Sequence, residues 1–145
     1  MEIKIIVMDA LKKILVFIGL FIFCSLFLYA QQSDKRSKYI LPIIESDSVF
    51  QSAIQSQEYV VVDFWAVWCK PCHLFLPEYE EIAKKFYKKV SFCKLDADKC
   101  TATMQEYEVK SIPAIIIFKK GVEIKRYVGL TAKERIIFDL EEIIK

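Results

Sequence analysis

The chain has 145 residues, of which 54% are hydrophobic and 28% are charged. This composition is typical of one globular domain with an additional apolar segment, and it excludes a disordered protein. The 21 basic and 19 acidic residues leave a net charge of +2, and they are spread along the chain without a basic stripe, so we expect no nucleic-acid partner. Five cysteines are too few and too dispersed for a disulfide-stapled scaffold.

The first 30 residues contain the additional apolar segment. Lysines precede an uncharged run at 14–30, and a polar stretch follows it. This pattern predicts an export segment. One interpretation is a signal peptide cleaved between Ala30 and Gln31, although Leu28 is bulkier than the small residue usual at that position. The other is an uncleaved anchor, because seventeen apolar residues reach the lower limit for spanning a bilayer; a buried core helix is a third alternative.

Basic residues flank the apolar run on both sides, so their distribution does not settle its orientation. We expect an exported protein in the periplasm or another extracytoplasmic space, which touches a membrane only through this segment if it is kept. Residues 31–38 are polar without periodicity and suit a linker. Cys24 lies inside the apolar run, where we interpret it as an apolar filler.

From residue 39 onward, the hydrophobic pattern alternates between strand and helix periods and predicts one domain over 39–145. We expect a helix capped by the side chains of Ser46–Ser48, a helix that starts near Pro71 and kinks at Pro77, a helix at 98–107, and a final helix that opens with a capping box at 131–134. Strands are expected near 39–44 and at 59–66, 90–95, 114–118 and 123–128. The order βαβαβαββα predicts an α/β sandwich whose sheet is parallel first and antiparallel at the end.

The stretch WAVWCKPCHLFLP at 65–77 places Cys69 and Cys72 three positions apart. Such a pair can be a metal clip, a structural staple or a reactive dithiol. The chain has no second close cysteine pair for a zinc site, so we expect neither a metal nor another cofactor. The pair follows a buried strand and opens a helix, where free N–H groups and the helix dipole stabilise a thiolate. We therefore expect Cys69 to be the nucleophile and Cys72 to resolve the mixed disulfide.

Several separated motifs follow one another over about 43–145: VVVDFWAVWCKPC, the helix with Pro77, CKLDAD, and KSIPAIIIFKKG followed by YVG. Together, in this order, they resemble the thioredoxin family. The resemblance implies a thioredoxin fold, which is a central mixed β-sheet flanked by helices. It also implies a protein dithiol–disulfide oxidoreductase that acts on substrate proteins containing disulfides.

The resemblance assigns roles to three further positions. Asp63 matches a buried acid that helps to remove the proton of the resolving thiol, and burial fits a carboxyl for that step by raising its pKa; the alternative is a strand acid that reaches solvent or a cap. Lys94 matches a lysine near this acid, with a solvated strand lysine as the alternative. Pro113, after Ile112, matches a cis-proline whose loop accepts extended substrate backbone and discourages metal capture.

The residues around the cysteines also have counterparts in the family. Trp65 and Trp68 match aromatics that cover the site, although both can equally be core residues. We expect the substrate to contact Trp68, Lys70, Pro71, Ile112 and Pro113. Lys70 replaces the commonest glycine, and its charge favours the thiolate and a somewhat more oxidising protein.

Three other residues have simpler interpretations. His73 follows the second cysteine and could add charge there, but an exposed helix residue without a catalytic role is the favoured interpretation. Cys93 is expected to be a small core residue on a strand. Cys100 resembles an extra, oxidisable cysteine of some thioredoxins, and a surface or cap position is favoured for it.

The leading functional hypothesis is an exported reductase of disulfides in substrate proteins. Outside the cytoplasm it cannot draw on a cytosolic flavoprotein, so a membrane dithiol carrier is the implied electron donor. A thiol oxidase or isomerase is the alternative within redox chemistry, favoured slightly by Lys70 and disfavoured by the Trp-Cys-x-Pro-Cys frame. A non-catalytic binding module is the third alternative, and the presence of Asp63, Pro113 and both cysteines argues against it.

Overall fold

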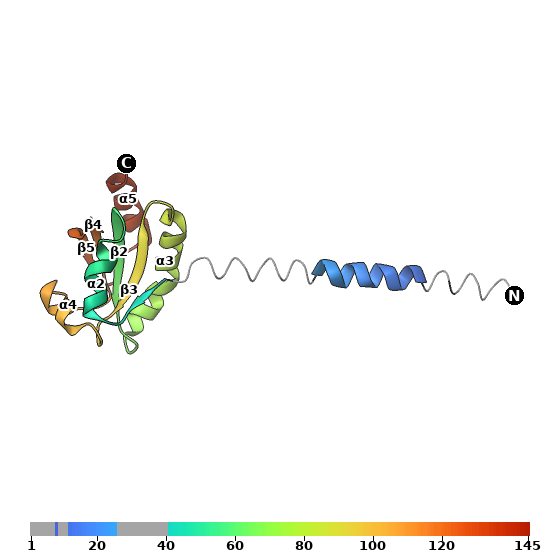
Figure 1. Ribbon diagram of the computed structural model, residues 1–145, viewed down its shortest axis with the longest axis horizontal. Coiled ribbons are helices and arrows are strands. Elements are labelled where there is room, and N and C mark those ends of the chain that lie inside the picture. Colours follow the sequence, from blue (N-terminus) through green and yellow to red (C-terminus); the bar gives the residue numbers. More distant parts are fainter. Residues whose placement is uncertain (1–7, 9–11, 26–40) are drawn as a thin grey trace. The chain divides into compact units, whose positions relative to one another are not determined.

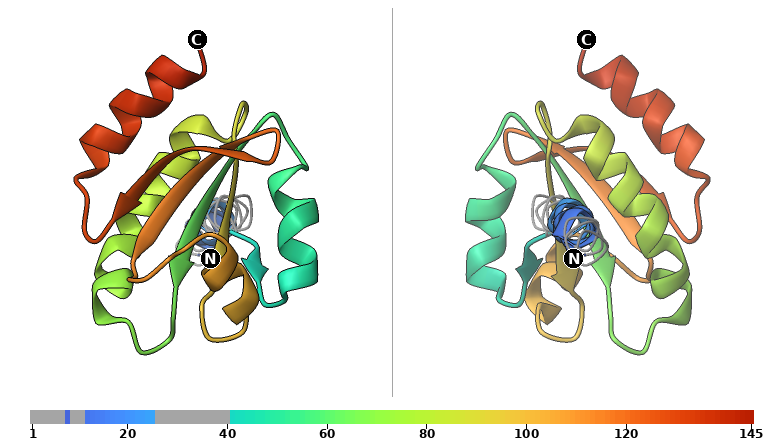
Figure 2. Two further views of the ribbon diagram at one scale, coloured as in Figure 1. Left: turned by 90° about the vertical axis from the view of Figure 1, so that its left-hand side faces the viewer. Right: turned by 90° about the vertical axis from the view of Figure 1, so that its right-hand side faces the viewer.

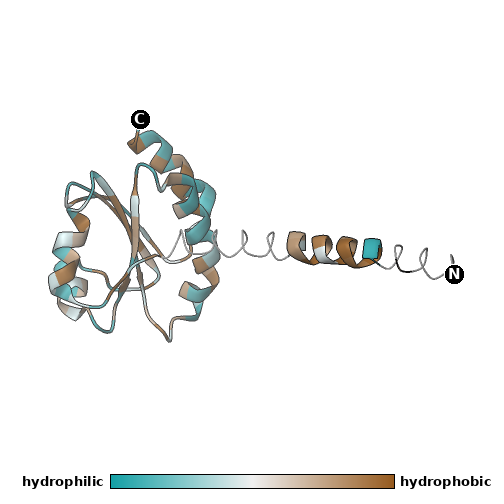
Figure 3. Cartoon of the chain, turned by 45° about the vertical axis from the view of Figure 1, so that its right-hand side comes forward, coloured by the Kyte–Doolittle hydropathy of each residue, from teal (hydrophilic) through white to brown (hydrophobic). Residues whose placement is uncertain are grey.

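A computed structural model describes Met8, residues 12–25 and residues 41–145 (Figure 1). The chain divides into two units, residues 1–40 and residues 41–145. In the first unit, 12–25 are helical, and hydrophobic residues cover most of this helix (Figure 3). No described helix has both the length and the hydropathy needed to cross a bilayer. The predicted cleavage point at Ala30 and the predicted linker at 31–38 lie outside the described residues.

The second unit contains nine regular elements in the predicted order. They are β1 (Ile43–Ile44), α2 (Asp47–Ile54), β2 (Tyr59–Trp65), α3 (Lys70–Phe86), β3 (Ser91–Asp96), α4 (Thr101–Glu106), β4 (Ala114–Lys119), β5 (Val122–Val128) and α5 (Lys133–Ile143). The sheet order is β1-β3-β2-β4-β5. Strand β3 pairs in parallel with β1 and β2, whereas β4 is antiparallel to β2 and β5. The predicted mixed sheet is therefore confirmed.

Helices cover both faces of the sheet, with α3 and α5 on one side and α2 and α4 on the other (Figure 2). Successive side chains of a strand point to opposite faces, and β2 is buried on both. On the α3 side, Val61 joins a core that includes Tyr79, Ile82, Ile117, Ile136 and Leu140. On the α2 side, Val60 and Val62 join Phe50, Ile54, Leu95, Ile116 and Phe118. The central strand therefore carries any polar residue it contains into the interior.

Tyr79 ties α3 to the middle of the sheet. Its fully buried hydroxyl lies 2.8 Å from the carbonyl oxygen of Cys93 and 3.0 Å from that of Val61, and it shares its proton between them. The helix continues through Pro77 from Lys70 to Phe86. The hydroxyl therefore fixes where the long helix lies along β2 and β3.

The structure corrects two predicted helix caps. Ser46 makes no cap bond to α2, and its hydroxyl pairs with that of Ser48 at 2.8 Å. The neighbouring Asp47 binds the first turn of α4 instead, because its Oδ1 accepts hydrogen bonds from the backbone N (2.7 Å) and the hydroxyl (2.6 Å) of Thr103. The capping box expected at 131–134 is also wrong: α5 begins at Lys133, after Ala132, which has no side-chain cap bond.

Helix α4 is shorter than the predicted span 98–107. Its first expected residues form a turn in which Asp96 accepts three hydrogen bonds: its side chain accepts from Asp98 N (3.0 Å), and its carbonyl accepts from Lys99 N (3.2 Å) and Cys100 N (3.0 Å). These bonds satisfy N–H groups without helical geometry, and the helix begins only at Thr101.

We expect Tyr79→Phe to lower the free energy of unfolding by about 1–3 kcal/mol, because the change removes the buried donor shared by two strand carbonyls. Tyr107→Phe is the matched control, since the Tyr107 hydroxyl is only part-buried and accepts one long bond of 3.4 Å from Gln51. Urea unfolding monitored by far-ultraviolet circular dichroism measures both variants. Equal losses in the two variants would contradict the role given to Tyr79.

Candidate active site

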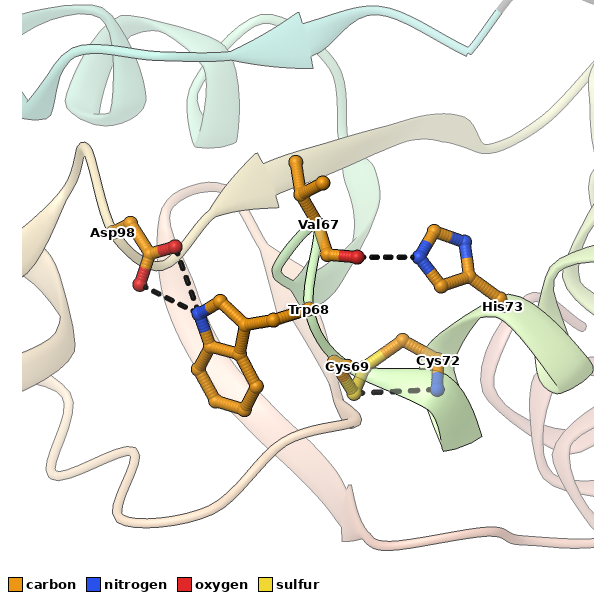
Figure 4. Close-up of a disulfide and its surroundings, with 6 residues drawn as sticks. All are labelled: Val67, Trp68, Cys69, Cys72, His73 and Asp98. Atoms are coloured by element: carbon orange, nitrogen blue, oxygen red, sulfur yellow. Dashed lines mark hydrogen bonds between the residues drawn. A yellow bond between two sulfur atoms is a disulfide. The ribbon is translucent and has the colours of Figure 1, made fainter.

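Cys69 and Cys72 form a disulfide at the junction of β2 and α3 (Figure 4). Cys69 is the N-cap residue of α3, and the backbone N–H of Cys72 donates to Cys69 Sγ at 3.2 Å. Each cysteine is 3% exposed. The Cys69 sulfur therefore sits where a helix N-terminus directs an N–H group at it, which is the placement predicted from the sequence and which favours a thiolate in the reduced form.

The loop that precedes Cys69 is held by two side chains (Figure 4). Trp68 is 69% exposed, yet its indole Nε1 donates to Asp98 Oδ2 at 2.9 Å. On α3, His73 Nε2 lies 2.7 Å from the carbonyl oxygen of Val67, and its ring meets Trp65 edge-on with centroids 6.0 Å apart. Sequence reasoning missed Asp98, which is separated from Trp68 by 30 positions, and it missed the contact of His73.

Asp63 is 1% exposed on the central strand, so the alternative of a strand acid that reaches solvent is wrong. It alternates with Val61 and therefore faces α3, the helix that carries Cys72. Its Oδ1 has no hydrogen-bond partner in the described part of the chain. Burial raises the pKa of Asp63 to about 7, and the nearby charge of Lys94 opposes this rise.

Lys94 is the neighbour of Asp63 in the parallel register of β2 and β3. It is 7% exposed, so the alternative of a solvated lysine is also wrong. Its ammonium group lies over the indole of Trp65, 3.7 Å from the ring centroid. Burial lowers the pKa of Lys94, against the attraction of Asp63 and Glu80. The aromatic face thus holds this cation beside the unpaired acid.

The loop before β4 completes the surroundings of the disulfide. The peptide bond between Ile112 and Pro113 is cis, as the family resemblance implies. Ile112 packs against the cluster of Ala66 and the two cysteines, together with Trp65 and Ala97. The carbonyl of the buried Pro113 accepts a bond from Gly129 N at 2.8 Å, which ties this loop to the end of β5. Lys70 and Pro71 are the exposed first residues of α3.

Cys93 and Cys100, the other two cysteines of the second unit, are free and buried. Cys93 is 5% exposed in the core between the sheet and α2, as predicted, and burial raises its pKa to about 12, with Asp63 adding to the effect. Cys100 precedes α4, but it is fully buried and its sulfur lies 3.7 Å from the carbonyl oxygen of Ile44. Of the two positions expected for Cys100, the surface is therefore wrong, whereas the cap position is confirmed, because Cys100 is the N-cap residue of α4. Among the described residues, no cluster of His, Cys, Asp or Glu could hold a metal ion.

The fold and the site together define a thiol–disulfide oxidoreductase: a dithiol at a helix N-terminus, beside a cis-proline loop and a buried acid. The thioredoxin family model matches residues 42–142. Among curated relatives, a thioredoxin of Alicyclobacillus acidocaldarius is 38% identical over 100 residues, covering 69% of this chain and 95% of the relative. A thioredoxin of Staphylococcus epidermidis is 43% identical over 91 residues, covering 63% and 86% respectively.

Solved structures agree with these relatives. The oxidised thioredoxin of Plasmodium falciparum superposes with a TM-score of 0.64 at 31% identity, and the match covers 73% of this chain and all of that protein. The chain belongs to the thioredoxin family. It carries a disulfide between Cys69 and Cys72, the pair expected of a thiol–disulfide oxidoreductase.

The raised pKa of Asp63 predicts an unusual dependence of stability on pH. The carboxyl ionises near 3.8 in the unfolded chain and near 7 in the folded one. Between these values the unfolded chain has lost a proton that the folded chain keeps, so the wild type loses stability as pH rises. The stability of Asp63→Asn relative to the wild type should therefore increase between about pH 4 and about pH 7, by up to roughly 4 kcal/mol.

Asp139→Asn is the control with the opposite sign. Burial alone would raise the pKa of Asp139, but hydrogen bonds from Lys125, Tyr127 and Arg135 together lower it to about 2. The stability that ionised Asp139 contributes is complete above the ordinary carboxyl pKa and is lost only as pH falls through about 2. Asp139→Asn should therefore be less stable than the wild type at pH 7, with a constant difference between pH 5 and pH 7. Urea titrations at each pH measure both variants, and a flat profile for Asp63→Asn would refute the assignment.

Proposed function

We propose that the chain is a protein-disulfide reductase that acts on exported substrate proteins. The observation that carries the proposal is the N–H group of Cys72 directed at Cys69 Sγ at the start of α3. This donor and the helix dipole stabilise a Cys69 thiolate, which is the form of cysteine that attacks a disulfide. Exposed apolar side chains beside the pair, Val67, Trp68 and Leu74, offer a surface for a protein substrate.

The proposed reduction has two exchange steps. The Cys69 thiolate attacks one sulfur of the substrate disulfide; a mixed disulfide forms, and the other substrate sulfur leaves as a thiolate. The Cys72 thiolate then attacks Cys69 Sγ, so the Cys69–Cys72 disulfide forms and the second substrate sulfur leaves. Two electrons pass from the dithiol to the substrate, and both substrate thiolates are protonated.

Asp63 fits the proton transfer in the second step. Cys72 must lose its proton before it attacks, and a carboxyl with a pKa of about 7 can accept that proton near neutrality. The acid and the thiol lie on the same face of the sheet, because Asp63 faces α3. Lys94, over the Trp65 ring, places a cation near the charged carboxylate that would otherwise be isolated.

The direction of electron flow is tested with insulin and dithiothreitol. We expect the full chain in mild detergent to accelerate insulin reduction, and Cys69→Ser to abolish the acceleration. Cys72→Ser should retain substrate on Cys69 as a mixed disulfide that mass spectrometry detects, because the resolving thiol is missing. If the wild type fails to accelerate reduction but oxidises reduced peptides in glutathione buffer, the oxidase alternative associated with Lys70 replaces this proposal.

We propose further that the apolar segment directs the domain out of the cytoplasm, with a membrane dithiol carrier as electron donor. The exposed apolar side chains of the helical residues 12–25 support this proposal. N-terminal sequencing of protein from fractionated cells tests it. A product that begins at Gln31 indicates a cleaved signal peptide, and a membrane-bound product that keeps Met1 indicates an anchor. An intact, freely soluble product in the cytoplasmic fraction would contradict export.

A further inference from the structure

His73 makes a contact that its exposed position does not suggest. Its backbone N–H donates to the carbonyl of Cys69 at 3.3 Å, as in an ordinary first helical turn. Its imidazole extends back beyond the helix, where Nε2 lies 2.7 Å from the carbonyl oxygen of Val67. Since a carbonyl can only accept, Nε2 carries the proton. One residue thus binds two carbonyls, on either side of the Trp68–Cys69 peptide.

The bonded segment is the turn that presents the nucleophile. Cys69 N donates to Ala66 O at 3.1 Å and closes a turn over 66–69. The carbonyl of Val67 lies within this turn, so the imidazole fastens the turn to α3. In Figure 4, the contact between Trp68 and Asp98 and the contact between Val67 and His73 lie on opposite sides of the segment.

Different bonds hold this turn in the oxidised and the reduced protein. In the oxidised protein, the disulfide itself holds Cys69 beside the N–H group of Cys72. In the reduced protein that covalent bond is gone, and only non-covalent contacts keep the thiolate in reach of the N–H group. A bond that keeps the turn closed therefore matters more to the reduced state, in which the anion must be stabilised.

We propose that His73 is a positioning residue that keeps the Cys69 thiolate at the N-terminus of α3 by hydrogen bonding to the carbonyl of Val67. The role belongs to the Nε2–H donor and not to the charge of the ring, because the neutral and the protonated imidazole both donate from Nε2. The inference concerns the reactivity of Cys69 and does not depend on which proteins are its substrates.

Two variants separate the donor from the rest of the side chain. His73→Leu replaces the donor with an apolar side chain, whereas His73→Gln keeps an N–H donor on a flexible, uncharged side chain. All proteins carry Cys24→Ser, because Cys24 is an exposed free thiol. The reduced chains are treated with iodoacetamide from pH 5 to pH 9, and mass spectrometry follows alkylation of the Cys69 peptide.

We expect His73→Leu to slow alkylation of Cys69 about three- to tenfold at neutral pH and to move its pH midpoint upward, which is the size of effect expected for one net hydrogen bond. The same variant should shift the equilibrium with glutathione toward the disulfide form by a similar factor, because a less stable thiolate disfavours reduction. His73→Gln should restore at least half of the wild-type rate at pH 8.5, because its side-chain amide still supplies an N–H donor.

Two results would overturn the inference. An unchanged rate and pH midpoint in His73→Leu would show that the turn stays closed without the imidazole. A His73→Gln variant as slow as His73→Leu would assign the effect to the ring, through its edge contact with Trp65, and not to the donor. Thermal unfolding of each reduced variant shows whether it is folded during the assay. If the wild type does not reduce insulin but the alkylation rates of the variants still differ as expected, only the proposed function is rejected and the role of His73 stands.

Discussion

The bond from the Tyr79 hydroxyl to two strand carbonyls sets the geometry on which the site depends. It fixes α3 against β2 at Val61, near the start of that strand. From Tyr79 back to Cys72 the helix rises about 10 Å, while β2 advances about 13 Å from Val61 to Trp65. The helix and the strand are antiparallel, so these two paths lead from the bond toward the same end of the sheet, and Cys72 comes to lie near the end of the strand that carries Asp63 and Trp65.

The same placement explains why the centre of the fold keeps an acid, Asp63, whose burial costs free energy. Asp63 occupies a strand whose other residues at 60–64 are apolar and buried, and its Oδ1 has no partner in the described chain. A nearby ion pair would relieve this cost and would also lower the carboxyl pKa. The cation of Lys94 rests on the Trp65 ring and opposes the effect of burial only in part, so the pKa of Asp63 stays at about 7 and the acid can exchange a proton near neutrality.

Much of this fold follows from local patterns, and the remainder depends on contacts between distant residues. The element order, the mixed sheet and the position of the cysteine pair were predictable, because buried strands and amphipathic helices leave periodic signals. Asp47 looked like a cap for its own helix but caps α4 through Thr103, 56 positions away. The burial of Cys100 and the bond between Asp98 and Trp68 also depend on contacts between residues that are distant in the sequence. The periodic pattern of a sequence does not indicate such pairings, and the exposure of His73 alone does not reveal that it binds a backbone carbonyl.

The surface around the pair combines exposure with order. Trp68 exposes 69% of its surface, yet its indole is hydrogen-bonded to Asp98. Exposed side chains usually lose rotamer freedom when a partner binds, and that loss weakens association. A tryptophan already fixed by a carboxylate has less freedom to lose, and the loop beneath it is closed by His73. Because the cysteines are each only 3% exposed, the substrate disulfide of the proposed function meets the ordered side chain of Trp68 as well as the reactive sulfur.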